Sequence, residues 1–410
     1  MPKPDVPIEL DRKFVEDPRA FYESLRHAPV QQVIMPPEAG AWLPPGRRVW
    51  LATSYSDARA LLADSRLRKD NDRMMELYRA RQAADTPERG FSSALEAHLL
   101  NLDPPDHTRL RKLVTQAFTR RTVERLRPRL EQVAAELLDD VEGAGTVDLL
   151  DAFASPLPII AICELLGVPH ADRARFRTWS GTIVRSADPA QLQDHSTALA
   201  AYLAELIEAK RAAPGEDLLS GLVHVTDAGD RLSEVELLSM AFLLLVAGHE
   251  TTVNLIGNGV LILLRRPELL ARLRQDPALI PGAIEEFLRF ESPVHLATLR
   301  FTAEPVRVGE VEIPAGEFVL VSLLAANRDA ARFPDPHECD ITRPAGGHLA
   351  FGHGIHHCLG APLARMEGEI ALRALLGRFG NLELDAAPDS VRWQESVLTR
   401  GLDTLKVRVS

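Results

Sequence analysis

The residues with the clearest chemical potential lie between Phe351 and Gly360, in the sequence FGHGIHHCLG. A single thiol, Cys358, is surrounded there by three histidines and three glycines. Glycine suits backbone that takes a positive φ angle or approaches a neighbour closely, so the glycines predict a tight loop. A helical apolar pattern begins at Ala361, and a cysteine that precedes a helix is stabilised as the metal-binding thiolate. The stretch therefore predicts a socket for a metal-bearing cofactor.

Three other interpretations of Cys358 explain this loop less well. A free cysteine is commonly buried as a small apolar side chain. A zinc site made by Cys358 and the three histidines would pack four ligands into six residues, which fits a tetrahedron poorly. Covalent haem attachment of the c type requires Cys-x-x-Cys-His, and no second cysteine lies nearby. None of the three accounts for the glycines.

The spacing Phe-Gly-x-Gly-x-His-x-Cys-x-Gly resembles the haem-binding loop of the cytochrome P-450 family, and all six specified positions are filled. In that family the cysteine is the thiolate ligand of haem iron. The resemblance implies a thiolate-ligated haem b, with Cys358 as the single iron ligand from the protein. It further implies cofactor contacts from Phe351, Gly352 and Gly360, and a propionate contact from His356.

A second group of polar residues lies in a long apolar segment from Ser233 to about Arg266. Ser233 and Glu236 form a capping-box pattern, which predicts a helix start, and the apolar residues that follow predict a buried helix. Its centre, AGHETT, places glycine and polar residues where a helix is weakened and buried polar groups need partners. We expect a functional interruption of the helix there.

AGHETT resembles the dioxygen-binding signature of the same family, which begins at Ala247 in this chain. Carried over by position, Gly248 opens the helix for dioxygen, and Glu250 and Thr251 deliver protons. A hydroxyl both donates and accepts hydrogen bonds, and a carboxyl group relays protons from solvent. His249 occupies the variable position of the signature and receives no role.

Basic residues elsewhere match further cofactor contacts of the family. His107 and Arg111 lie on a predicted helix and match propionate-binding positions, as does Arg300. Carboxylates bind well to such charged donors. Arg109 and Lys112, on the same predicted helix, are expected to face an acidic electron-transfer partner, because opposite charge steers association.

Glu286 and Arg289 match the Glu-x-x-Arg element of the family, a buried pair that supports the cysteine loop. An isolated pair at this spacing is ordinarily a surface ion pair. Glu338 stands where many members carry a basic residue that joins the pair, and neighbouring carboxylates repel unless an arginine bridges them or one is protonated. We therefore expect an altered network, in which His337 or Arg343 acts as the substitute.

Length and composition indicate a soluble globular protein. The chain has 410 residues, of which 46% are hydrophobic and 26% are charged. A net charge of −11 argues against binding to nucleic acid or anionic membranes, which require basic surfaces. The longest apolar run, Met240 to Ala247, is far shorter than the ~20 residues that span a bilayer. Because the cysteines form no paired framework and the N-terminal sequence lacks an apolar run, we expect a cytoplasmic location. We also expect a monomer.

The remaining sequence predicts helices with a smaller β region. Strands are expected at 30–35 and 49–52, and a hairpin is expected to turn at Gly309 and Gly316. Residues 70–97 are polar and predict a long loop. No linker or repeat divides the chain, so residues 1–410 are expected to form one domain. The resemblance implies a mainly α fold with a smaller β region, the triangular prism of the cytochrome P-450 family.

The function that the resemblance implies is a haem-thiolate mono-oxygenase of secondary metabolism. It would use dioxygen to hydroxylate or epoxidise an apolar macrolide or other polyketide, a steroid or a terpenoid. Electrons would come from a separate ferredoxin and an NAD(P)H-dependent reductase. The alternative is a haem-thiolate gas sensor or carrier without turnover, which has no need of Glu250 and Thr251. Expected substrate contacts are the 70–97 loop with Phe242, Val246, Val294 and Val397.

Overall fold

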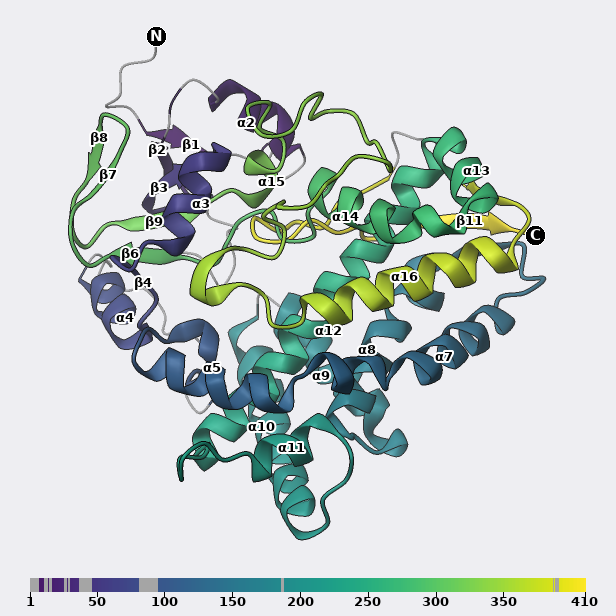
Figure 1. Ribbon diagram of the computed structural model, residues 1–410, viewed down its shortest axis with the longest axis horizontal. Coiled ribbons are helices and arrows are strands. Elements are labelled where there is room, and N and C mark those ends of the chain that lie inside the picture. Colours follow the sequence, from purple (N-terminus) through teal and green to yellow (C-terminus); the bar gives the residue numbers. More distant parts are fainter. Residues whose placement is uncertain are drawn as a thin grey trace. The chain divides into compact units, whose positions relative to one another are not determined.

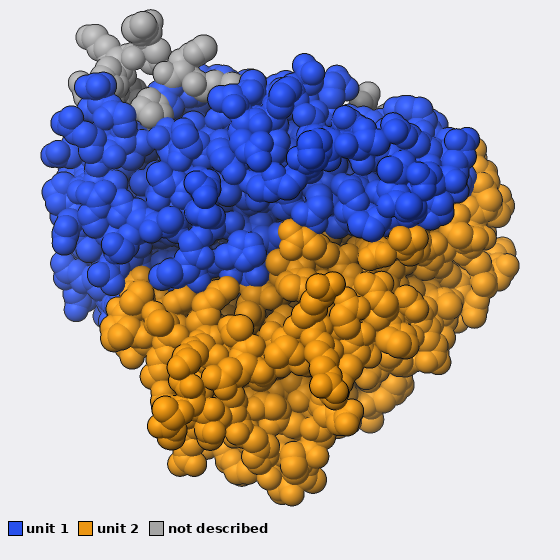
Figure 2. All heavy atoms as spheres, viewed as in Figure 1, with its two compact units in different colours: residues 1–86, 261–358, 390–403 blue, residues 87–260, 359–389, 404–410 orange. Residues whose placement is uncertain are grey.

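The structure is a computed structural model that describes residues 7–10, 14, 17–25, 28, 30–36, 46–80, 95–185, 188–385, 387 and 391–410. The chain is mainly helical with a smaller β content, as the sequence predicted (Figure 1). It divides into two compact units (Figure 2). Unit 1 holds residues 1–86, 261–358 and 390–403, and unit 2 holds residues 87–260, 359–389 and 404–410. Neither unit is a contiguous segment of the sequence.

Unit 1 contains a sheet in which six strands are described, in the order β1-β2-β3-β9-β6-β4. The strands β2 and β3 pair antiparallel, and β3 pairs parallel with β9. The two strands expected near residues 30 and 50 are thereby confirmed. Their bounds are β1 Ile8–Glu9, β2 Val30–Ile34, β3 Arg48–Ala52, β9 Phe318–Val321, β6 Arg300–Thr302 and β4 Leu67–Arg68.

The expected hairpin is confirmed only in its first half. The strands β7, Val306–Val308, and β8, Val311–Ile313, pair antiparallel around Gly309, whose φ is 57°. The chain turns again at Gly316, but the next strand, β9, joins the larger sheet between β3 and β6. The sheet partner of a short strand depends on distant residues, which a local pattern does not specify.

The helices of unit 1 include one that the sequence reading missed. Residues 71–79 form α4, although residues 70–97 were expected to be a loop, and residues 81–94 lie outside the described part of the chain. The Asp70 side chain accepts a hydrogen bond from the Arg73 N–H at 2.8 Å, so an N-cap starts a polar helix that has no buried residue. The helices are α2 Pro18–Leu25, α3 Tyr55–Ala63, α4 Asn71–Arg79, α13 Pro267–Gln275, α14 Ile280–Phe290 and α15 Leu323–Ala326, with 3-10 turns at Pro277–Leu279 and Gly354–His356.

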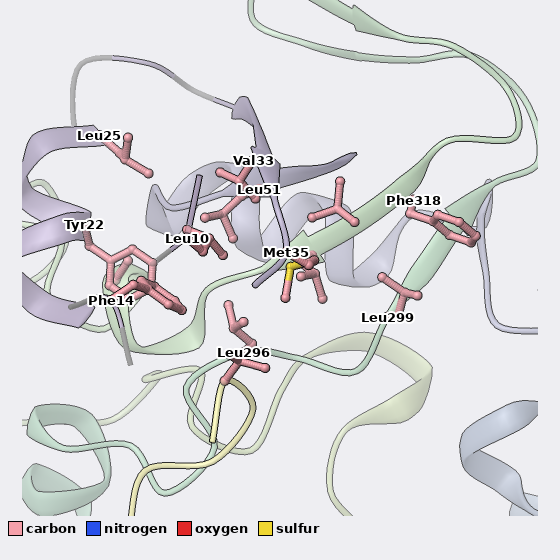
Figure 3. Close-up of a cluster of buried hydrophobic side chains, with 14 of the residues drawn as sticks. Leu10, Phe14, Tyr22, Leu25, Val33, Met35, Leu51, Leu296, Leu299 and Phe318 are labelled. Atoms are coloured by element: carbon pink, nitrogen blue, oxygen red, sulfur yellow. The ribbon is translucent and has the colours of Figure 1, made fainter. Parts of the chain in front are cut away.

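An apolar core fills unit 1 around the sheet (Figure 3). Phe14 packs edge-on against Tyr22, with their ring centroids 5.6 Å apart. Met35 and Leu296 are 0% exposed within the same cluster. Each such side chain contributes roughly 1.5–3 kcal/mol when it is fully buried, so this cluster anchors the strands that carry the site residues of unit 1.

Unit 2 is built mainly from helices with a small antiparallel sheet, whose described strands have the order β10-β11-β5. Pro-Pro, Gly and Asp residues separate successive helices, and Asp217 caps α11 through its side chain. The strands are β10 Leu382–Leu384, β11 Lys406–Val409 and β5 Thr146–Asp148. The helices are α5 Asp106–Ala117, α6 Arg120–Glu124, α7 Arg127–Asp139, α8 Pro156–Leu166, α9 Arg173–Arg185, α10 Pro189–Ala212, α11 Leu218–His224, α12 Glu234–Leu264 and α16 Ala361–Arg378, with short turns at Leu99–Asn101, Leu150–Ala154 and His170–Asp172.

The long helix α12 starts as the sequence predicted. The Ser233 N–H donates to Glu236 Oε2 at 2.8 Å, and the Glu236 N–H donates to Ser233 Oγ at 3.3 Å, which completes the capping box. The expected interruption at AGHETT is wrong, because the helix is continuous over 31 residues. Its length and composition would allow it to cross a membrane, but 72% of its most apolar window is buried inside the protein, as in a core helix.

Candidate active site

The cysteine loop of unit 1 is folded tightly on itself. The Cys358 N–H donates to the Phe351 carbonyl at 2.9 Å. Gly352 and Gly354 have φ angles of 71° and 75°, a region that other residues rarely adopt. A Cβ atom on Gly354 would lie 2.7 Å from the Leu62 carbonyl oxygen of α3, so this glycine also permits a close approach of two backbones. These two glycines are required by the loop geometry.

The thiol of Cys358 differs from the other two thiols in accessibility. Cys358 is exposed, whereas Cys163 and Cys339 are buried, and burial raises the pKa of each of these two to about 12. A thiol that stays protonated in the core is chemically inert. Cys358 precedes Gly360, which caps α16 with an ordinary φ of −77° and has no conformational need to be glycine.

The loop histidines are not gathered around a metal position. His353 and His356 are half-buried, and His357 is exposed with its ring centroid 6.4 Å from that of Phe351. Burial, and secondarily the charge of Arg59, lowers the pKa of His353. Over the described part of the chain, no three His, Cys, Asp or Glu side chains form a group that could hold a metal ion. The geometry therefore gives no support to a zinc site.

Glu286 and Arg289 form a fully buried ion pair on α14. Arg289 Nε and Nη2 donate to the two carboxylate oxygens of Glu286 at 2.7 Å, and both side chains are 0% exposed. Arg289 Nη1 donates to the carbonyls of Asn327 and Pro336 at 3.0 Å. Nη2 donates to the Glu338 carbonyl, also at 3.0 Å. All five N–H groups of this guanidinium are thus used, which fixes α14 to two segments that precede the cysteine loop.

Arg343 completes the network that was expected to be altered at Glu338. Arg343 Nε lies 3.4 Å from Glu286 Oε1. The Glu338 side chain points to solvent and only its main-chain carbonyl is used, so the expected repulsion between carboxylates does not arise. His337 is not the substitute, because it lies 3.3 Å from Glu23 instead.

Two further contacts hold the segment before the cysteine loop, and the sequence reading missed both. The Leu349 N–H donates to Asn327 Oδ1 at 2.6 Å. The Ala350 N–H donates to His348 Nδ1 at 3.2 Å, so Nε2 carries the proton and donates to Glu285 at 3.2 Å. The doubled glutamate in EEFLRF was the available signal for the second contact.

The three basic residues matched to propionate contacts are buried or half-buried. In unit 1, Arg300 lies on β6 with 4% exposure and donates from Nη1 to the Thr298 carbonyl at 2.9 Å. In unit 2, His107 is 2% exposed and Arg111 is half-buried, one turn apart on α5. Buried N–H donors at these positions are suited to an anionic ligand.

The other basic residues of α5 are engaged within unit 2. Arg109 pairs with Asp230 at 3.4 Å and also with Glu236. Lys112 lies 2.5 Å from Asp227. Both cations are thus paired with acidic residues of the same chain, and the expectation that they face an acidic partner protein stays a prediction.

The centre of α12 presents a narrow accessible face within a buried helix. Ala247 is exposed, and Leu243, Leu244 and Thr251 are half-buried, while the residues between them on the other faces are largely buried. Spacings of three and four residues place these four on one side of the helix. Thr251 Oγ1 donates to the Ala247 carbonyl at 2.9 Å. This face is apolar except for the threonine hydroxyl at its end.

Packing explains why residue 248 is a glycine, and the sequence did not reveal this. A Cβ atom there would lie 2.7 and 2.9 Å from the terminal side-chain atoms of Ile162 on α8. The glycine thus permits close contact between α12 and α8, and the helix around it stays regular. The expected opening of the helix at this position is absent from the geometry.

Buried ionisable groups flank this part of α12. His249 Nδ1 donates to the Leu245 carbonyl at 3.1 Å, and its Nε2 lies 3.9 Å from Glu250, which is 4% exposed. Glu367 on α16 is also buried, and burial raises its pKa well above the ordinary value, an effect that the Thr252 hydroxyl partly offsets. Glu367 was missed, although a lone acid within an apolar helical stripe was the available signal.

The expected substrate contacts fall into two groups. Phe242 and Val397 are each 2% exposed and belong to the core. Val246 and Val294 are half-buried. The expected substrate contacts did not include Leu243 and Leu244 of the accessible face, because distinguishing the faces of an almost uniformly apolar helix requires its neighbours.

Comparison with known proteins decides the family. The model of the family described as cytochrome P450 matches residues 186–407. Cytochrome P450 107B1 of Saccharopolyspora erythraea is 52% identical over 405 residues, which cover 99% of this chain and 98% of the relative. The chain belongs to the cytochrome P450 family. The polyketide biosynthesis cytochrome P450 PksS of Bacillus subtilis is 43% identical over 363 residues, covering 88% of this chain and 89% of the relative.

A solved cytochrome P450 shares the fold. The structure of the tirandamycin C-bound P450 monooxygenase TamI is 51% identical and has a TM-score of 0.90, with 98% of this chain and 100% of that chain covered. The protein is thus a haem-thiolate monooxygenase with the cytochrome P450 fold, and the alternative of a sensor without turnover is set aside. The accessible thiol of Cys358, in a tightly folded glycine-containing loop, fits the thiolate ligand of haem b.

Proposed function

We propose that this cytochrome P450 hydroxylates or epoxidises a polyketide-type apolar small molecule. The observation that carries the proposal is the accessible face of α12, where Leu243, Leu244 and Ala247 lead to Thr251. An apolar surface that ends in one hydroxyl suits a large apolar substrate held beside a proton donor. The name of the relative PksS and the ligand of TamI support the polyketide class.

The cofactor would be held by the residues that match the haem contacts of the family. Cys358 is the iron ligand, and Phe351, Gly352 and Gly360 shape its loop. Haem supplies the iron at which dioxygen is activated. His107, Arg111, Arg300 and His356 bind the two propionates, since cationic and N–H donors that are shielded from water favour carboxylates.

Thr251 and Glu250 would handle protons. The Thr251 hydroxyl donates to the Ala247 carbonyl, so its oxygen remains able to accept a hydrogen bond from a ligand or water on the accessible face. The Glu250 carboxyl group is buried beside His249, and it supplies protons to the Thr251 hydroxyl. The roles of Ala247 and Gly248 are to keep this face open and to let α12 approach α8.

Electrons would come from a ferredoxin and an NAD(P)H-dependent reductase. Arg109 and Lys112, which are paired with acidic residues of unit 2, would lie at the docking surface for the ferredoxin. Residues 1–410 would form a single cytochrome P450 domain that acts as a monomer in the cytoplasm. Both units recruit stretches from across the chain, which favours one folding domain.

The proton role is tested by Thr251→Ala, with Thr251→Ser and Thr252→Ala as matched variants. NAD(P)H consumption and product formation are measured together in the reconstituted system. We expect Thr251→Ala to lower the product formed per NAD(P)H several-fold, and Thr251→Ser to retain it. The Thr252 hydroxyl is buried and bonds to the Gly248 carbonyl, so its removal should leave the ratio near that of the wild type. Full coupling in Thr251→Ala would refute the proton role.

The substrate class is tested by the spin-state shift of the haem Soret band. A panel of macrolactones, linear polyketides, steroids and terpenoids is titrated into the ferric enzyme. We expect saturable shifts with polyketides. Shifts confined to steroids or terpenoids would contradict the proposed class and leave the monooxygenase assignment intact.

A further inference from the structure

A buried lysine in unit 1 lies outside the roles described so far. Lys69 directly follows β4 and is only 3% exposed. Lysine is almost never fully buried unless its ammonium group interacts with an acceptor, because removing the charge from water is costly. The burial of Lys69 therefore indicates a specific electrostatic role for this position.

Strand register places Lys69 opposite Arg300. The strands β4 and β6 pair antiparallel, with Leu67 opposite Thr302 and Arg68 opposite Phe301. Continuing this register by one residue sets Lys69 directly across from Arg300. Residues directly opposite in an antiparallel pair project from the same face, with their Cβ atoms ~5 Å apart.

Both cationic side chains bind the same residue. Lys69 Nζ donates to Thr298 Oγ1 at 2.6 Å, and Arg300 Nη1 donates to the Thr298 carbonyl at 2.9 Å. Arg300 is 4% exposed, so two positive groups converge in a region shielded from water. Like charges directly opposite on a sheet destabilise it, and burial strengthens the repulsion. An anion bound between the two groups attracts both of them, so the net interaction becomes favourable.

We propose that Lys69 and Arg300 together bind one carboxylate, and that in the holoenzyme this carboxylate is a haem propionate. The inference rests on the propionate role proposed for Arg300 and adds Lys69 as a further cofactor-binding residue. A carboxylate has two oxygens, so one can accept from the ammonium group and the other from the guanidinium group. Thr298 acts as a positioning residue that holds both donors.

The experiment measures how fast the holoenzyme transfers haem to excess apomyoglobin, and the midpoint potential of its iron. Lys69→Met removes one charge-assisted hydrogen bond, so haem transfer should accelerate about tenfold or more. The potential should fall, because a nearby positive charge favours the more negative ferrous state. Lys69→Gln keeps a donor for Thr298 without the charge, and it should lower the potential as Lys69→Met does. Lys69→Arg should retain both wild-type values.

Arg68→Met is the matched control, since it removes the same charge from the adjacent residue, whose side chain points to the opposite face of the strand. It should leave both measurements unchanged. If Lys69→Gln transfers haem at the wild-type rate and keeps the wild-type potential, the inference is overturned.

Two further arms separate the possible sources of failure. If Arg300→Met is also without effect, the proposed propionate role of Arg300 fails as well, whereas an effect of Arg300→Met alone rejects only Lys69. Substrate-type carboxylic acids and their methyl esters are then titrated into the ferric enzyme. Selective loss of acid binding in Lys69→Gln, with unchanged haem transfer, would overturn the inference and assign the pair to a substrate carboxylate.

Discussion

Two buried polar regions, the Arg289 network of unit 1 and the centre of α12 in unit 2, satisfy their hydrogen bonds in opposite ways. Arg289 donates to a carboxylate on its own helix and to three carbonyls from distant segments. In α12, His249, Thr251 and Thr252 each donate to a carbonyl four residues earlier in the same helix. The first arrangement ties segments together, and the second leaves the tertiary structure independent of those bonds.

The difference matches what each region has to do. A thiolate ligand must be held in one position, which saturated long-range bonds achieve. Groups that move protons must exchange partners, and a side chain bonded back to its own helix can rotate away without loosening the fold. Breaking bonds in the two regions should therefore have different consequences, chiefly for stability in unit 1 and chiefly for chemistry in α12.

The largest effect is expected from Arg289→Met. It leaves the buried Glu286 carboxylate with only the longer Arg343 contact and the Asp340 N–H among its described partners, and losing one partner of a buried pair costs about 3–5 kcal/mol. Urea unfolding of the holoenzyme measures the loss, and the carbon monoxide difference spectrum should shift away from the thiolate-ligated form. Arg343→Met removes a longer contact of 3.4 Å with Glu286 and hydrogen bonds to the carbonyls of Pro334 and Asp335, and it should cost clearly less because it leaves the Glu286–Arg289 pair in place. If Arg289→Met loses no more unfolding free energy than Arg343→Met does, the contrast between the two regions fails.

In α12 a packing change should lower the free energy of unfolding more than the loss of a hydroxyl group does. Gly248→Ala forces a Cβ atom against Ile162, and overpacking of this kind costs about 1–3 kcal/mol. Combining it with Ile162→Val removes the atom at 2.7 Å and should recover part of the loss in the unfolding free energy. Additive effects in the double mutant would show that the two residues do not interact.

A buried neutral histidine of unit 1 should also make the stability of the protein sensitive to pH. Burial, and secondarily the charge of Arg400, lowers the pKa of His295 to about 3, and Tyr22 Oη lies 3.3 Å from its Nδ1. The folded state resists a proton that the unfolded chain accepts near pH 6.5, so stability is complete above that pH and falls below it. The slope approaches ~1.4 kcal/mol per pH unit.

Unfolding in urea at pH 7.0 and pH 5.0 measures this dependence. His295→Gln should flatten it, because glutamine does not titrate. An unchanged difference between the two pH values in the variant would mean that other groups dominate the acid sensitivity.

The smallest effect is expected from Glu338→Arg. The side chain is exposed and only its carbonyl serves Arg289, so the free energy of unfolding should change by no more than about 0.5 kcal/mol. Haem content should remain that of the wild type. A marked gain or loss would show that the side chain at position 338 belongs to the network after all.

Errors in the sequence reading fall where distant residues decide the outcome. The helix α4 was read as a loop because it buries no apolar residue, and its Asp70 cap is a single weak local signal. The ion pairs of Arg109 and Lys112 were not predicted, because their acidic partners lie more than a hundred residues away. The substitute for Glu338 was narrowed to two residues, and only the packed chain distinguishes Arg343 from His337.

The sequence alone determined those features that depend on residues close together in the chain. The glycine-rich loop around Cys358, the capping box at Ser233 and the helical spacing of Glu286 and Arg289 depend on backbone preferences and neighbours within four positions, which a linear pattern records. The tertiary structure decided which side chains face one another. It assigned Gly248 to the contact with Ile162, and it set Lys69 across the sheet from Arg300. Such pairings depend on strand register and helix packing, which bring together residues far apart in the sequence.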